Sequence, residues 1–125
     1  MFEVGIEAEF EAAHQLRGNF GPATRLHGHT YRVEAIVRGE SLCDDGTLCD
    51  ISMLEQATNN VVSSLDYRNL DDLDVFAGQN TTAEIVAKYV FDKIARRLSG
   101  HGLSSLIVRV WESPHAYAAY EGSLN

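Results

Sequence analysis

The sequence predicts an α+β domain in which a four-stranded antiparallel sheet carries two helices on one face, in the order ββααββ. Two observations carry this prediction. Apolar and polar residues alternate near both ends of the chain, whereas apolar residues recur with the helical period in its middle. The 125 residues are 45% hydrophobic, which suits a single domain over residues 1–125 with a modest core.

Two long strands are expected in the first third of the chain. One alternating apolar row covers residues 2–14 and another covers residues 29–39, and Pro22 with nearby glycines marks the loop between them. Residues 41–47, rich in Asp and Gly, predict a turn that leads into a short strand, Thr47–Cys49.

Each helix is expected to begin at a capping box, in which a hydroxyl residue is followed three positions later by a glutamate: Ser52 with Glu55, and Thr81 with Glu84. The first helix then covers residues 53–65, and Gly100 ends the second. Strands over residues 103–112 and 116–120 complete the sheet. Because such a sheet leaves one face and two edges without partners, we expect the protein to form oligomers.

The composition excludes several classes of partner. Eighteen acidic against ten basic residues give a formal charge of -8, and no basic run interleaves with aromatic residues, so neither nucleic acid nor an anionic membrane surface is expected to bind. No apolar run suits a membrane span or a signal peptide, which makes the cytoplasm the expected compartment. Cys43 and Cys49 lack metal-binding spacing and are expected to be free thiols, with a disulfide across a hairpin as the alternative.

Three histidines are the strongest functional signal. His27 and His29 lie two apart on an expected strand, so their side chains leave the same face, and His14 continues the apolar parity of the first strand. Without an intervening bulge, all three imidazoles point to the buried side of the sheet. Three neutral imidazoles suit an open zinc site that keeps a fourth position for water or substrate. The alternative is that each histidine is an ordinary hydrogen-bonded core residue.

Five segments resemble, in the same order, successive motifs of the 6-pyruvoyl-tetrahydropterin synthase and 6-carboxytetrahydropterin synthase family: Phe10-Glu11-Ala12-Ala13-His14, Leu26-His27-Gly28-His29-Thr30-Tyr31, Leu65-Asp66-Tyr67-Arg68-Asn69-Leu70, Asn80-Thr81-Thr82-Ala83-Glu84 and Val110-Trp111-Glu112-Ser113. The resemblance implies the tunnelling fold, in which subunits join their sheets into an oligomeric barrel. It also implies a homohexamer, a dimer of trimers, with active sites at subunit interfaces, and Zn²⁺ at the three histidines.

The resemblance assigns substrate-binding roles as well. Glu112 matches the family's glutamate that accepts hydrogen bonds from the amino group and adjacent N–H of a pterin ring, a bidentate arrangement. Thr81, Thr82 and Glu84 fall where the family lines its pterin pocket. Glu112 also fits an exposed strand carboxylate, and helix capping alone accounts for Thr81 and Glu84.

Two departures from the family concern catalysis. The loop before His27, which holds the catalytic cysteine in family synthases, reads Phe20-Gly21-Pro22-Ala23-Thr24-Arg25 and has no thiol. The family's Asp-His pair appears as Asp66-Tyr67, and a phenol is a poor base near neutral pH but can donate a proton. We therefore expect Asp66, Tyr67 and His115 to be the replacement catalytic residues, although His115 also fits a solvated turn.

The resemblance implies a zinc-dependent lyase that transforms the side chain of 7,8-dihydroneopterin or its triphosphate. Retro-aldol cleavage of that side chain and a noncatalytic zinc- and pterin-binding homologue are the alternatives; an unrelated zinc hydrolase is disfavoured because no H-E-x-x-H motif is present. Four basic residues fit either triphosphate contacts or solvated surface charges: Arg25, Arg32, Arg68 and Lys88.

Overall fold

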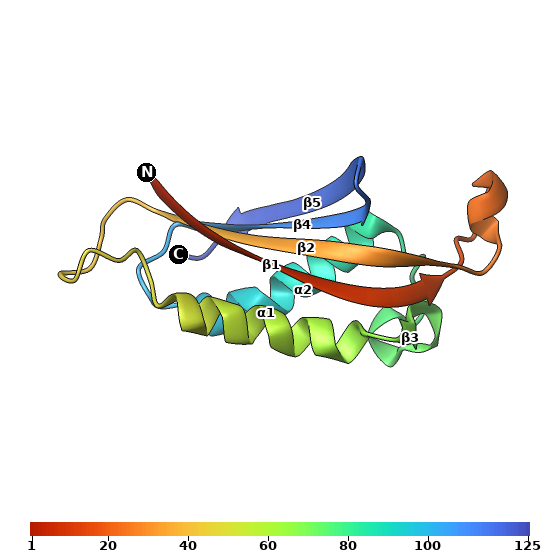
Figure 1. Cartoon of the computed structure of the whole chain (residues 1–125), viewed down its shortest axis with the longest axis horizontal. Helices are drawn as coiled ribbons and strands as arrows, with labels where there is room; N and C mark the ends of the chain where they lie inside the picture. Colours follow the sequence, from red (N-terminus) through yellow and green to blue (C-terminus); the bar gives the residue numbers. More distant parts are fainter.

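Two layers, a twisted sheet and a pair of helices, make up the computed structural model, which describes residues 1–125 (Figure 1). The strands are β1 (Phe2–His14), β2 (His27–Gly39), β3 (Arg68–Asn69), β4 (Ser105–Ser113) and β5 (Ala116–Ser123). The helices are α1 (Ile51–Leu65) and α2 (Ala83–Leu98), with short 3-10 turns η1 (Gly21–Thr24), η2 (Leu70–Asp72) and η3 (Asp74–Phe76). Both α-helices lie on the same side of the sheet, as predicted, and the other face is uncovered (Figure 1).

The sheet has five strands rather than the four expected, in the order β3-β1-β2-β4-β5. The additional strand β3 has two residues and lies parallel to β1, where Ala12 pairs with Arg68 and Ala13 with Asn69. A two-residue strand carries no alternating pattern, so periodicity could not reveal it. It closes only the last part of the β1 edge and leaves the rest of that edge without a partner.

The β1–β2 ladder is continuous and without a bulge. It runs from the pair Phe2 and Gly39 at one end to the pair His14 and His27 at the other, so β2 begins two residues earlier than predicted. The three imidazoles therefore lie on the same face of the sheet as the apolar row of each strand, as expected. Their inward-facing residues join α1 and α2 in one cluster of 25 buried hydrophobic residues.

Both helices begin at a different cap from the one predicted. The α1 N-cap is Asp50, whose Oδ1 accepts the Ser52 N–H at 2.9 Å. The α2 N-cap is Thr82, whose hydroxyl accepts the Ile85 N–H at 3.3 Å, because Thr81 is engaged elsewhere. In each helix a side-chain oxygen of the cap residue accepts a backbone N–H of the first turn that has no partner within the helix. The predicted capping boxes would have met the same need.

The short strand predicted at Thr47–Cys49 does not form. Asp45 accepts hydrogen bonds from both the N–H and the hydroxyl of Thr47, at 3.0 and 2.7 Å, and these close a local turn. Cys43 and Cys49 lie in this region as free thiols. The turn before α1 lies at the opposite end of the molecule from the tip where β1 and β2 meet η1 (Figure 1). Neither α1 nor α2 has the length and apolarity to cross a bilayer.

Gly122 marks a close approach between β5 and α2. A Cβ at this position would lie 2.7 Å from Cζ of Phe91. We expect Gly122→Ala to lower the free energy of unfolding by about 1–3 kcal/mol through overpacking, as measured by denaturant titration. Glu121→Ala, at an exposed neighbouring position, is the control. The Gly122→Ala/Phe91→Leu double variant should lose less stability than the sum of the single losses, and strict additivity would contradict this packing.

Candidate metal and substrate site

The three predicted histidines converge at one end of the sheet. His14 is the last residue of β1, His27 is the first of β2 and lies opposite it, and His29 follows on the same face. One nitrogen from each ring lies within 4.8 Å of the others. The three imidazole centroids are 4.6 to 5.1 Å apart. The continuous ladder therefore assembles a triplet of nitrogen donors.

Two of the rings are held in a defined tautomer. His14 Nδ1 lies 2.8 Å from the Thr81 carbonyl oxygen, and His27 Nδ1 lies 2.7 Å from that of Arg25. Because a carbonyl oxygen can only accept, both hydrogen bonds require a proton on Nδ1. Nε2 of each neutral ring is then left with a free lone pair, which is the form that binds metals.

The triplet fits a metal ion better than it fits a core of ordinary histidines. Nε2 of His14 and Nε2 of His29 are both buried and have no hydrogen-bond partner. A buried acceptor without a partner is costly, and a metal ion would satisfy both atoms. In a tetrahedral zinc site the ligand nitrogens are about 3.4 Å apart, so small side-chain rotations would suffice.

His29 is also suited electrostatically to this role. Burial lowers its pKa below the usual value, the carboxylate of Glu112 opposes that shift, and the neighbouring imidazoles add to it. A lowered pKa keeps the ring neutral near pH 7, and a neutral ring is the metal-binding species. The donor set therefore fits a divalent transition metal.

Glu112 connects the histidines to a cavity. Its Oε2 lies 3.9 Å from His29 Nε2. The carboxylate also lines a cavity of about 280 Å³ beside the triplet, together with Thr82 and Glu84 from the start of α2. The remaining lining residues are Leu16, Phe20, Ala83, Ala116, Tyr117 and Ala118. A mostly apolar cavity with a few carboxylates suits a flat, nitrogen-rich ring. Leu16 and Phe20 lie in a loop without periodicity, so sequence patterns could not identify them as lining residues.

Thr81 has a different place from Thr82. It is fully buried and lies behind His14, where its carbonyl oxygen accepts the His14 Nδ1–H. Its hydroxyl donates to Oδ1 of Asp71 at 2.8 Å. Thr81 therefore contacts a histidine and not the cavity, and Asp71 is a residue of this region that sequence patterns did not reveal.

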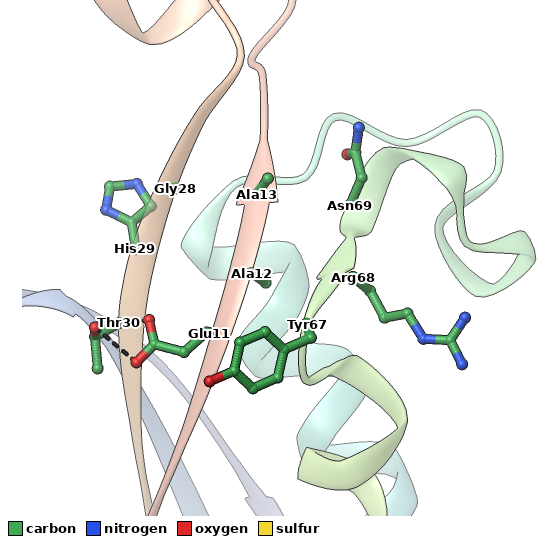
Figure 2. A pocket seen from close by; sticks show the side chains of 9 residues that line it. All are labelled: Glu11, Ala12, Ala13, Gly28, His29, Thr30, Tyr67, Arg68 and Asn69. Carbon is green, nitrogen blue, oxygen red and sulfur yellow. Dashed lines mark hydrogen bonds between the residues drawn. The ribbon is translucent and has the colours of Figure 1, made fainter.

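Asp66 and Tyr67 lie along the edge of β1 that faces away from β2. Oδ1 of Asp66 accepts the Glu11 N–H at 2.9 Å, and the Tyr67 N–H donates to the Glu11 carbonyl at 2.6 Å. Tyr67 has a left-handed backbone, with φ at 56°, and the residue is 83% exposed. In Figure 2 its ring lies over β1 beside Glu11, whereas His29 is attached to β2 beyond that strand. Asp66 and Tyr67 are therefore held by β1, and within one chain Tyr67 meets the triplet only at a cavity that His29 also lines.

A second cavity, of about 520 Å³, lies in front of Tyr67. Arg68 and Asn69 line it from β3, and Glu11 and Thr30 line it from the uncovered face of the sheet (Figure 2). The Thr30 hydroxyl donates to the Glu11 carboxylate across the strands, at 2.8 and 2.9 Å from its two oxygens. The two cavities share no lining residue: Tyr67 and His29 line this one, and Glu112 lines the other.

His115 is exposed in the turn between β4 and β5, where its backbone N–H donates to Oγ of Ser113 at 3.2 Å. Asp66, Tyr67 and His115 thus stay predictions as catalytic residues. Two of the basic candidates for triphosphate contacts are paired with acidic residues: Arg32 lies 2.8 Å from Glu7, and Lys88 lies 2.6 Å from Asp92.

The three histidines should be required for metal binding. We expect His14→Ala to lower Zn²⁺ affinity by at least about 100-fold in competition with a chromogenic chelator, because it removes one of three donors. His101→Ala, which removes an exposed histidine outside the triplet, is the control and should bind Zn²⁺ as the unaltered protein does. Unchanged stoichiometric binding by His14→Ala would contradict the site.

Comparison with known proteins agrees with this geometry. The family model described as 6-pyruvoyl tetrahydropterin synthase matches residues 3–123. The 6-carboxy-5,6,7,8-tetrahydropterin synthase of Bacillus subtilis is 31% identical over 134 residues, covering 99% of this chain and 90% of that protein. The dihydroneopterin monophosphate aldolase of Pyrococcus furiosus is 33% identical over 93 residues, covering 74% of this chain and 75% of that protein. The structure of Caenorhabditis elegans 6-pyruvoyl tetrahydropterin synthase superimposes with a TM-score of 0.80 at 30% identity, covering 98% of each chain. The resemblance found in the sequence is therefore confirmed, and the chain belongs to the 6-pyruvoyl tetrahydropterin synthase family of pterin enzymes.

Proposed function

We propose that this protein is a zinc-dependent lyase that transforms the side chain of 7,8-dihydroneopterin or of a phosphorylated form of it. The observation that carries the proposal is the pair of buried, unpartnered Nε2 atoms of His14 and His29, with Glu112 3.9 Å from the second. A metal site and a ring-binding carboxylate are then direct neighbours. A pterin held by Glu112 would extend its side chain toward the metal.

His14, His27 and His29 would hold Zn²⁺ through three neutral nitrogens, which leaves one coordination position for substrate. When bound, Zn²⁺ supplies Lewis-acid stabilisation of negative charge that develops on a side-chain oxygen of the substrate. Activation of the side chain would thus depend on the three histidines, and binding of the ring would depend on Glu112.

Glu112 would fix the orientation of the ring. Its two carboxylate oxygens can accept the parallel N–H donors of the pterin amino group and the adjacent ring nitrogen. The apolar cavity walls would exclude water from those hydrogen bonds and strengthen them. Thr82 lines the same cavity beside the start of α2 and would limit where the ring can lie.

Proton transfer is where this chain departs from family synthases. Elimination of triphosphate requires a base that removes a carbon-bound proton, and no thiol is near the histidines. Cys43 and Cys49 lie beyond the far end of β1, whose length is about 40 Å. Burial also raises the pKa of the Cys49 thiol, which keeps it protonated and a poor base.

Tyr67 would then serve as a proton donor for a neighbouring subunit. Tyr67 is exposed, and the uncovered face and free edges of the sheet are suited to contact other copies. The homohexamer with shared active sites that we propose would bring such a phenol to a second triplet. Asp66 would hold Tyr67 in place through β1.

Side-chain cleavage is the second candidate reaction, favoured by the missing thiol and by the similarity to an aldolase. A base removes the proton of the second side-chain hydroxyl, and the bond between the first two side-chain carbons breaks. The second carbon leaves as an aldehyde, and the electron pair passes into the conjugated ring system. A proton donor such as Tyr67 then protonates the first carbon, giving 6-hydroxymethyl-7,8-dihydropterin. This path needs no base strong enough to ionise a C–H bond.

Product analysis separates these reactions. Zinc-loaded protein is incubated with 7,8-dihydroneopterin, its monophosphate and its triphosphate, and the products are identified by mass spectrometry. Release of triphosphate supports elimination, and 6-hydroxymethyl-7,8-dihydropterin supports cleavage. If no substrate is converted while pterin binding persists, the lyase proposal is wrong and the noncatalytic homologue is supported.

Glu112→Gln tests the anchor. The amide keeps the size of the side chain but offers one acceptor oxygen and no charge, so we expect kcat/KM to fall by about 10²-fold or more. Metal content should be unchanged. Glu55→Gln, an exposed position on α1, provides the matched control. Full activity in Glu112→Gln would show that the ring binds elsewhere.

A further inference from the structure

We infer that Asp71 is a positioning residue for the metal site, acting on His14 through Thr81. The inference rests on the proposed function only in requiring that the three histidines bind a metal ion. It assigns a role to a carboxylate that lies outside both the triplet and the substrate cavity.

A chain of hydrogen bonds connects Asp71 to the histidine. Asp71 Oδ1 accepts the Thr81 hydroxyl at 2.8 Å, and the Thr81 carbonyl oxygen accepts the His14 Nδ1–H at 2.8 Å. The Thr81 hydroxyl oxygen lies farther from the same nitrogen, at 3.4 Å. Because the hydroxyl proton is donated to Asp71, its oxygen can only accept from His14. Every hydrogen bond in this chain therefore favours the tautomer with Nε2 free.

The second oxygen of Asp71 holds the strand that carries the histidine. Oδ2 accepts the backbone N–H of Gln15, the residue after His14, at 2.8 Å. One carboxylate thus bridges the end of β1 and the segment before α2. With the Thr81 carbonyl fixed on one side and the strand on the other, the His14 ring has little freedom to rotate away from His27 and His29.

Burial makes this arrangement consequential. His14 and Thr81 are both fully buried, so water cannot replace a lost hydrogen bond between them. The Asp71 carboxylate at the outer end of the chain fixes the Thr81 side chain, and with it the residue whose carbonyl accepts the His14 hydrogen bond. Partners of this kind behind a metal-ligating histidine typically contribute about 10–100-fold to metal affinity.

The same two segments are joined by a second bridge that does not touch the histidine. Asn80 accepts the Arg17 N–H at 2.9 Å and donates to the Arg17 carbonyl at 3.0 Å. This bridge is the natural control. If Asp71 only tied the segments together, loss of either bridge would affect the metal site to a similar degree.

The test is Zn²⁺ affinity of the full-length protein, measured by competition with a chromogenic chelator and paired with the melting temperature of the metal-free protein. We expect Asp71→Ala and Thr81→Val each to weaken Zn²⁺ binding by about 10–100-fold. The double variant should be no weaker than the worse single variant, because both remove the same chain. Thr81→Ser, which restores the hydroxyl, should bind Zn²⁺ nearly as the unaltered protein does.

Two controls should retain full affinity. Asp72→Ala removes the same charge from the adjacent exposed position, and Asn80→Ala removes the second bridge. Substituting Co²⁺ for Zn²⁺ adds a spectroscopic measure, since a displaced imidazole would alter the visible absorption of bound Co²⁺. Affinity within twofold of the unaltered protein in Asp71→Ala, or equal losses in Asn80→Ala, would overturn the inference. Because the readout is metal affinity, absent pterin turnover would count against the proposed function alone.

Discussion

The pairing of His14 with His27 at the end of the β1–β2 ladder is the constraint on which the functional site depends. It is the last of thirteen consecutive residue pairs without a bulge, so the register set by the apolar core also sets the spacing of the metal ligands. A slip of one residue would turn His27 and His29 to the uncovered face. The same β1–β2 register is therefore required for the packing of the core and for the geometry of the site.

The triplet is supported by four parts of the structure. The strands supply the spacing, the segment before α2 supplies the hydrogen bond to His14, and the end of η1 supplies the one to His27. On the core side the ring of Tyr31 packs against the edges of His14 and His29 and stacks on Phe10 with centroids 4.7 Å apart. Burial raises the pKa of the Tyr31 phenol, which therefore stays protonated next to the ligands. Rigid surroundings of this kind allow a metal to bind without reorganising the fold.

Features with a regular period could be predicted from the sequence, and features that depend on tertiary contacts could not. The long strands, both helices and the shared face of the histidines follow from alternation and helical spacing. The strand β3 is too short to show a period. The helix caps differ from the predicted ones because Asp50 and Thr82 accept the first backbone N–H groups in place of the residues of the expected boxes. Sequence patterns alone could not show that Thr81 lies behind His14, since the two residues are 67 positions apart. Likewise, the cavity that Tyr67 lines depends on the side of β1 on which its loop emerges.

Gly28 lies between the two ligands of β2 and has no side chain. A methyl group at that position would meet only the Ala12 carbonyl oxygen, at 3.5 Å, and would point toward the cavity of the uncovered face. The backbone there does not require glycine. A larger residue at position 28 would therefore reduce the volume of that cavity without replacing any of the three imidazoles. For protein engineering, this offers a way to reshape the outer cavity at a residue whose side chain would leave the opposite face of β2 from the coordinating imidazoles.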